Sequence, residues 1–166
     1  MDNFDTNNFK NTLQHFLFEH TPIRGNIVHL NHTYRQALQH QSLPLVLKKA
    51  LGELMAASAL LSATLKMEGA MVLQLQSKGA LKLLVVKCSS ALEMRATAKW
   101  AGEIADQSFL ELIQNGQFVI TLDPEQGEAY QGIVPIEGET IAEMLENYMQ
   151  RSQQIDTCLL YTSRCV

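Results

Sequence analysis

The stretch "LGELMAASALLSATLKMEGAMVLQLQSKGALKLLVV", from Leu51 to Val86, decides the fold because its hydrophobic pattern changes partway along. Before Gly69, the middle of the predicted helix is apolar on every side of a helical projection, which is typical of a helix with contacts all round. After Gly69, apolar and polar residues alternate with a period of two, as in a strand with one buried face. The stretch therefore predicts a buried helix that leads directly into a β-sheet.

The predicted helix extends from residue 42 to residue 69. Ser42 is a residue type that caps helix starts, Pro44 suits a first turn, and Gly69 suits a helix end. The longest uncharged run of the chain, Leu54 to Leu65, lies inside this helix and is much shorter than the ~20 residues that span a bilayer. We therefore expect a core helix and no membrane partner.

Five strands are predicted after this helix, at residues 70–76, 80–88, 93–100, 117–123 and 128–136. The first strand places Met71, Leu73 and Leu75 on one face, and the second is apolar on both faces, as a central strand is. The third has one wet face, because polar residues alternate with small and apolar ones. Its inward set is Met94, Ala96, Ala98 and Trp100, and its outward set is Arg95, Thr97 and Lys99.

The last two strands are predicted to form a hairpin around "DPEQGE", residues 123–128. Pro135 marks an edge strand or a strand end, because proline cannot donate to a hydrogen-bond ladder.

The N-terminal segment "NNFKNTLQHFLFEH", residues 7–20, is predicted to be a helix that ends before Pro22. Its apolar residues at helical spacing are Phe9, Leu13, Phe16 and Leu17. A short strand at residues 23–30 and a second helix at residues 31–41 follow.

Two helices are predicted in the C-terminal half. A short one, at residues 108–117, ends near Asn115–Gly116. In the last one, Thr140 and Glu143 fit a capping box. Its apolar stripe is Ile141, Met144, Leu145, Tyr148 and Met149. The whole pattern predicts an α+β fold, a largely antiparallel sheet system packed with helices in a single domain.

The composition limits the partners. The net charge of the 166 residues is -4, and no cluster of Lys and Arg appears, so nucleic acid is excluded as a partner. Charged residues make up 18%, below the roughly 25% of typical soluble domains, which favours a surface made for contact. The N-terminus lacks the basic start and apolar run of a secretory signal, so we expect a cytoplasmic protein.

Histidine and cysteine offer few candidates for chemistry. His29 and His32 could supply two metal ligands, but a stable site needs three or four, so ordinary structural histidines are favoured. Cys88 closes an apolar strand and could be a nucleophile, although a buried small hydrophobe is the usual identity of such a residue. Cys158 and Cys165 form neither CxxC nor CxC with any other cysteine, so a zinc site cannot be built from the three.

Carboxylates offer a second possibility, since Glu125 with Glu128, or Glu137 with Glu139, could pair for acid–base chemistry. Such residues more often solvate a turn or a helix start. No glycine-rich phosphate-binding motif is present. The residues taken alone therefore predict a domain that is not an enzyme, with no catalytic or metal-binding residues.

Three stretches together resemble the redox-regulated chaperone family of the bacterial heat-shock protein thirty-three type. They are Leu51 to Val86, "QFVITLDPEQGEAYQGIVPIEG" and "ENYMQRSQQIDT". "IRG", residues 23–25, is similar to the first core strand of that family. The likeness covers Phe16 to Thr157 and rests on order, spacing and residue type over many positions.

The resemblance implies an ATP-independent holdase that binds unfolding proteins under oxidative or heat stress. Family members hold zinc through four cysteines, in a CxC and a CxxC, within a C-terminal domain. Oxidation of these cysteines releases the zinc, exposes the client-binding surface and accompanies dimer formation. Loss of the metal unfolds such a small domain, because its binding energy is folding energy. This chain has none of the four redox cysteines, so the resemblance assigns it no zinc, and a homodimer is one expected form.

The domain boundaries follow from the resemblance and from a change of pattern near the C-terminus. Residues 1–157 are expected to be the chaperone core domain, incomplete at its C-terminal end. The final segment "CLLYTSRC" and Val166 keep neither strand alternation nor helical spacing. Residues 158–166 are therefore interpreted as a truncated or non-native tail.

Three functions stay open at this point. The leading hypothesis is a client-binding core without its redox switch; the others are an inactive incomplete domain and a thiol enzyme using Cys88. The sequence does not show which apolar residues contact clients. The helical candidates are Phe109, Leu112, Ile113, Met144 and Met149, which their spacing assigns to the core instead.

Overall fold

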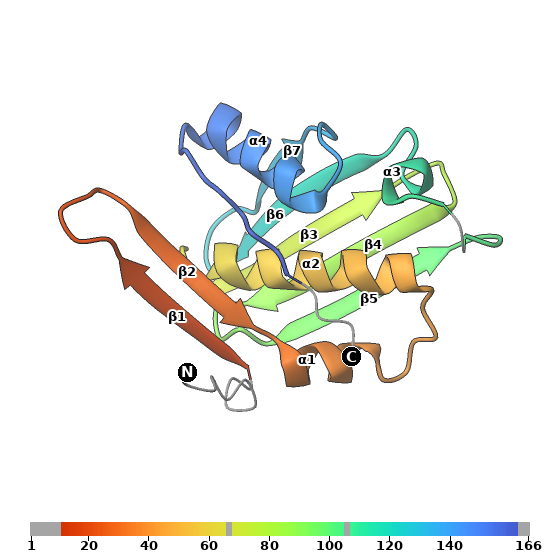
Figure 1. Ribbon diagram of the computed structural model, residues 1–166, viewed down its shortest axis with the longest axis horizontal. Coiled ribbons are helices and arrows are strands. Elements are labelled where there is room, and N and C mark those ends of the chain that lie inside the picture. Colours follow the sequence, from red (N-terminus) through yellow and green to blue (C-terminus); the bar gives the residue numbers. More distant parts are fainter. Residues whose placement is uncertain (1–10, 66–67, 105–106, 163–166) are drawn as a thin grey trace, which may run out of the picture.

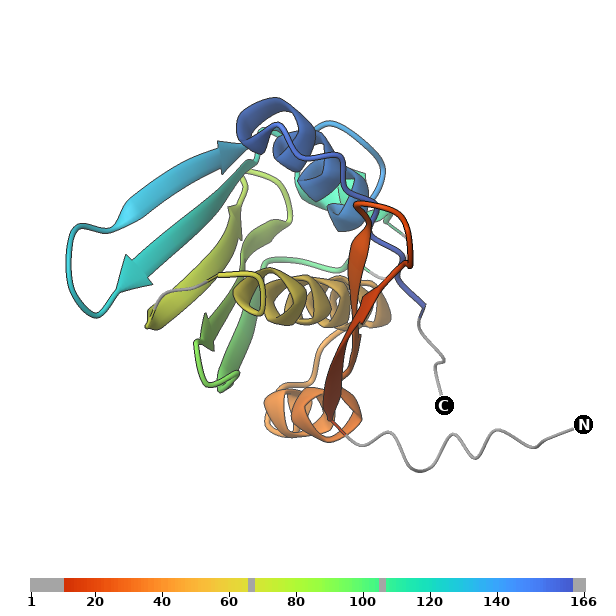
Figure 2. The same ribbon diagram turned by 90° about the vertical axis from the view of Figure 1, so that its left-hand side faces the viewer.

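A five-stranded antiparallel sheet forms the body of the protein, and the helices lie on one of its faces (Figures 1 and 2). The computed structural model describes residues 11–65, 68–104 and 107–162. Its elements are, in chain order, β1 (Thr12–Leu17), β2 (Arg24–His29), α1 (Asn31–Leu38), α2 (Leu45–Ser62), β3 (Gly69–Gln76), β4 (Leu81–Ser89), β5 (Met94–Trp100), α3 (Phe109–Leu112), β6 (Gln117–Pro124), β7 (Tyr130–Val134) and α4 (Ile141–Gln153). The predicted α+β fold with antiparallel sheets is confirmed.

The strands follow the order β5-β4-β3-β6-β7, while β1 and β2 form a separate two-stranded sheet. The strand predicted from the period of two after Gly69 is confirmed as β3, and Met71, Leu73 and Leu75 on its predicted inner face are all buried. In the register, Leu73 lies opposite Val86 of β4 and Ile120 of β6. The strand that the sequence predicts as central, β4, is indeed flanked by β3 and β5.

Helix α2 crosses the sheet and is buried along most of its length, as its all-round apolar pattern predicts (Figure 1). Leu47, Leu51, Leu54 and Met55 are fully buried and belong to one core cluster with Phe118 of β6. The sheet lies on one side of α2, and the β1–β2 hairpin lies on the other (Figure 2). The helix therefore forms a middle layer that contacts both sheets.

The predicted ends of α2 are wrong. Pro44 occupies the N-cap position itself, with no side-chain cap, because the helix begins at Leu45 and Ser42 lies outside the first turn. At the other end the helix stops at Ser62, and Gly69 begins β3. Gly69 is required there because a Cβ would lie 2.3 Å from the backbone oxygen of Asp123 on the neighbouring strand.

The predicted N-terminal helix is also wrong, because residues 12–17 form β1. Leu13, Phe16 and Leu17 have helical spacing, but the segment pairs in continuous antiparallel register with β2, the strand that the sequence does predict. Pro22 lies in the turn between the two strands. Phe9 lies outside the described residues.

The remaining helices are confirmed in position, although α3 ends at Leu112 and not near Asn115–Gly116 as predicted. Helix α4 is fastened at its start by side chains. The Thr140 hydroxyl accepts a hydrogen bond from the Glu143 N–H, but the Glu143 carboxylate accepts from the Glu139 N–H, so only half of the predicted capping box forms. Glu53 of α2 accepts a hydrogen bond from the Ala142 N–H at 2.9 Å. Burial raises the pKa of Glu53, an effect that this hydrogen bond opposes. A carboxylate of α2 thus joins α2 to α4.

Tyr148 of α4 packs over the edge strand β7. A Cβ on Gly132 would lie 2.3 Å from the Tyr148 hydroxyl oxygen, so the ring occupies the space that a side chain would fill. Burial, followed by the neighbouring Tyr130, raises the pKa of Tyr148 to about 12. The glycine in β7 therefore determines how closely α4 approaches the sheet.

We expect Leu51→Ala to lower the free energy of unfolding by about 2–5 kcal/mol, because it leaves a cavity between α2 and the sheet. Leu45→Ala, on the same helix at a side chain that is 59% exposed, should change it by no more than about 0.5 kcal/mol. Urea unfolding followed by circular dichroism measures both. Equal shifts of the two midpoints would contradict the position of α2 in the core.

Candidate functional site

Exposed apolar side chains gather on the hairpin of residues 12–29, formed by β1, its turn and β2. Buried residues of the described chain form one core cluster, so large apolar side chains outside it need another explanation. The exposed large hydrophobic residues of the hairpin are Phe16, Leu17, Phe18, Ile23 and Ile27. Leu17 is 78% exposed. The other exposed large hydrophobic residues are spread over the described helices, strands and loops.

Four of these side chains lie on the same face of the hairpin. The Phe18 N–H donates to the Ile23 backbone oxygen at 3.1 Å, which extends the β1–β2 pairing by one step. Side chains of opposite residues, and of residues two apart along a strand, point to the same face. Phe16, Phe18, Ile23 and Ile27 therefore form one apolar face. The rings of Phe16 and Phe18 meet edge to face, with centroids 5.6 Å apart.

Gly25 lies at the centre of this face, directly opposite Phe16. A Cβ on Gly25 would be 2.1 Å from the nearest carbon of the Phe16 ring. The ring thus lies on the bare backbone of β2, an arrangement in which an aromatic residue covers a strand glycine. The absence of a side chain at residue 25 holds Phe16 flat on the apolar face.

The hairpin is held at its base and projects from the body at its turn (Figure 1). At the base, the Asn11 side-chain oxygen accepts from the N–H groups of His32 and Thr33, which caps the start of α1. Strand β2 packs against α2, with β1 outside it (Figure 1). At the turn, the Thr21 N–H donates to the Phe18 backbone oxygen. The turn end, which carries Phe18 and Ile23, is therefore the outermost part of the apolar face.

The histidine pair considered from the sequence does not form a metal site with other described residues. Among these, no group of three or more His, Cys, Asp or Glu is placed to hold an ion. His29 lies in β2 beside Thr12, with 3.5 Å between its Nδ1 and the threonine hydroxyl. His32 lies in α1. His15 Nδ1 is 2.6 Å from the side-chain oxygen of Asn26 across the hairpin.

Cys88 lies in the core of β4 and is fully buried. Burial raises the pKa of its thiol, and the Ser62 hydroxyl partly opposes this effect. The thiol therefore stays protonated, opposite to the thiolate that a nucleophile or metal ligand needs. Cys158 is exposed, and Cys165 lies outside the described residues. The described cysteines do not fit the zinc site of the resembled family.

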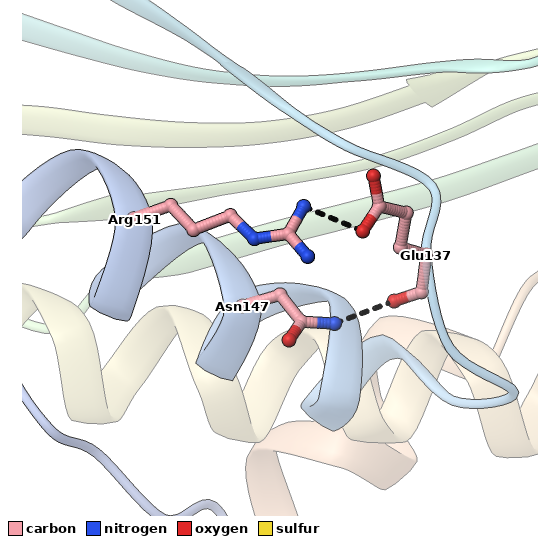
Figure 3. A network of polar contacts seen from close by, with 3 residues as sticks. All are labelled: Glu137, Asn147 and Arg151. Carbon is pink, nitrogen blue, oxygen red and sulfur yellow. Dashed lines mark hydrogen bonds and ion pairs between the residues drawn. The ribbon is translucent and has the colours of Figure 1, made fainter.

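The glutamates considered as acid–base pairs lie in turns and in the loop that contacts α4. Figure 3 shows that Arg151 binds the Glu137 carboxylate at 2.5 Å, while the Asn147 side chain donates to the Glu137 backbone oxygen. These contacts fasten the loop after β7 to α4. Glu125 and Glu128 are exposed in the β6–β7 turn. Neither arrangement brings two carboxylates together around a described cavity.

The helical residues considered for client contact lie in the core, as their spacing predicted. Leu112, Ile113 and Met144 are buried, and Phe109 and Met149 are half-buried against the same cluster. The exposed hairpin is not predicted from the sequence, because the helical spacing of Leu13, Phe16 and Leu17 indicates a helix where β1 lies. The hairpin could have been predicted from two residues that follow Phe18. Pro22 and Gly25 interrupt regular structure, and such a pair is typical of a turn that leads into a strand.

A solved structure shares this fold. A crystal structure of a 33 kDa chaperonin, a heat-shock protein 33 homologue from Thermotoga maritima, matches with a TM-score of 0.67 at 20% identity. The match covers 80% of this chain and 48% of that one, and it supports the fold alone. No described helix is long and apolar enough to cross a membrane.

The family model described as "Hsp33 protein" matches residues 11–164, and the chain belongs to this family. A 33 kDa chaperonin of Methylobacillus flagellatus is 63% identical over 147 residues, which are 87% of this chain and 50% of the relative. That of Chromobacterium violaceum is 45% identical over 94% of this chain and 54% of the relative. The family predicted from the sequence is confirmed. The chain spans about half the length of these relatives.

We expect Gly25→Ala to destabilise the hairpin by about 1–3 kcal/mol, because the new methyl group displaces the Phe16 ring. In a Phe16→Ala background the same change should cost much less. Amide hydrogen exchange in β1 and β2 measures the difference. An equal loss of protection in both backgrounds would show that the ring contact is not the cause.

A thiol reagent should label Cys88 of the folded protein far more slowly than Cys158, because the first thiol is buried with a raised pKa. In denaturing urea the two rates should become similar. Mass spectrometry of peptides after timed labelling distinguishes the sites. Rapid labelling of Cys88 in the folded state would revive the hypothesis of a thiol enzyme.

Proposed function

We propose that this chain is an ATP-independent holdase that binds unfolding proteins through the apolar face of the β1–β2 hairpin. The observation that carries the proposal is the gathering of Phe16, Phe18, Ile23 and Ile27 on one exposed face. Membership of the Hsp33 family supports the class of activity. Burying apolar surface contributes about 25 cal/mol per Å² whatever the sequence of the client, which suits binding to many unfolding proteins.

The shape of the hairpin supports the same function. A two-stranded hairpin is marginally stable by itself, so its turn end can adapt while its base stays fixed to α1 and α2. Aromatic and aliphatic side chains provide contact area without demanding a particular polar pattern. Binding of this kind prevents aggregation because it covers the apolar segments by which unfolding chains associate.

The cysteines of this chain bear on whether its client binding depends on oxidation. Cys88, Cys158 and Cys165 form no CxC or CxxC pair, so client binding by this chain should not depend on oxidant. We also propose that residues 1–157 are the core domain, that the chain is located in the cytoplasm and that a homodimer is one of its forms. We assign the chain no catalytic role, since the buried Cys88 disfavours the alternative of a thiol enzyme.

In an assay of thermal aggregation of citrate synthase, the purified chain should reduce light scattering equally with and without peroxide. Phe18→Thr, Ile23→Thr and Ile27→Thr together should remove most of this protection, because they replace exposed apolar side chains of this face by residues that still favour strands.

The matched control changes three exposed apolar residues elsewhere, with Leu45→Gln, Leu110→Gln and Ile133→Thr. It should protect as well as the unmodified chain. Urea unfolding of each variant verifies that it is folded. No protection by the folded, unmodified chain would refute the holdase function and favour an inactive domain, and equal losses in the two triple variants would refute the role of the hairpin.

A further inference from the structure

The outer edge of β1 presents backbone groups that pair with no described strand. In antiparallel strands, residues alternate between bonding to the partner strand and pointing away from it. Phe18 bonds to Ile23, so Phe16 and Gln14 also point toward β2. The N–H and C=O groups of Leu13, His15 and Leu17 therefore point outward along the free side of β1.

This edge lacks the features that protect other sheet edges. Natural edge strands are guarded by charged side chains, proline or bulges, which prevent another strand from adding. Edge strand β5 carries Arg95 and Lys99, and β7 is followed by Pro135. From Thr12 to Phe18 there is no Asp, Glu, Lys, Arg or Pro, and the register with β2 is continuous.

Apolar side chains flank the free edge on both faces of the hairpin. Phe16 and Phe18 lie on one face, and Leu17 lies on the other. An added strand would therefore place its own side chains beside apolar groups on either face. Charged residues in it would lose water beside these groups without gaining an ionic partner from β1, which is costly.

We propose that the free edge of β1 binds an uncharged, extended segment of an unfolding client as an added β-strand. This inference rests on the proposed function and specifies its mode: backbone hydrogen bonds to Leu13, His15 and Leu17 hold the segment, and the flanking side chains cover it. Strand addition relies on hydrogen bonds to the backbone, which all clients have in common. The partner is thus an apolar, proline-free segment that has lost its own strand neighbours.

The first experiment compares two fluorescent peptides of eight alternating valine and threonine residues, with blocked ends. One is unmodified, and the other is N-methylated at two adjacent central residues, so both of its edges lose a donor while the side chains are unchanged. Fluorescence anisotropy should show binding about tenfold weaker for the methylated peptide, since backbone hydrogen bonds are lost.

The second experiment removes an outward N–H from the protein. His15→Pro deletes the donor in the middle of the free edge, at a position where proline spares the β1–β2 ladder. His15→Thr is the matched control, because both variants lose the contact with Asn26 and only the first loses the N–H. His15→Pro should weaken binding of the unmodified peptide about tenfold, while His15→Thr should not.

The outcomes separate the binding mode from the function. Equal binding of the two peptides, with protection of citrate synthase intact, would overturn strand addition and leave the holdase function standing. Failure of both peptides to bind, together with no protection, would overturn both. A dimer in analytical ultracentrifugation that only His15→Pro dissociates would assign the edge to a second copy of the chain, and it would also overturn the proposal. The peptide comparison decides the matter if His15→Pro does not fold.

Discussion

The packing of α2 between the two sheets is the contact on which the rest of the structure depends. Leu47, Leu51, Leu54 and Met55 of this helix are fully buried. One side of α2 packs on the five-stranded sheet, and the other packs on β2 of the hairpin (Figure 2). Because the middle of α2 is apolar all round, it can be a shared core for layers that do not otherwise form one sheet.

The hairpin is held in place mainly by its contacts with α1 and α2, because a two-stranded hairpin is only marginally stable by itself. Its base is fixed through Asn11 to α1 and through β2 to α2, whereas its turn end projects from the body. Segments with few buried contacts open more readily than the core around them. The molecule therefore combines a packed body with an apolar extension. This combination suits a protein that binds partners without fixed shape.

Much of the fold could be predicted from the sequence, because buried apolar residues recur at regular spacing in the central region. The alternation at Met71, Leu73 and Leu75 and the all-round apolar pattern of α2 each correspond to one structure. Element ends were less predictable. Ser42 and Gly69 have the chemistry of helix caps, but α2 is shorter than its apolar pattern, and Gly69 serves the close approach of β6.

The candidate site was harder to predict, since it depends on contacts between distant residues. The spacing of Leu13, Phe16 and Leu17 fits a helix as well as a strand, and pairing with β2 decides between them. Nothing local shows that Phe16 will lie on Gly25. The family could be recognised because the residue patterns that define it lie in the core. The exposed apolar residues do not show the regular spacing of buried residues.

Phe16 over Gly25 and Tyr148 over Gly132 are the same packing arrangement in two separate parts of the fold, the hairpin and the β7–α4 contact. In each, a ring fits into a notch left by a missing side chain. A larger residue at either notch would lift the ring and, with it, tilt the element that carries it. Two hydrogens, standing where other residues have a carbon, thus set the position of one ring on the exposed face of the hairpin and of another in the core beneath α4.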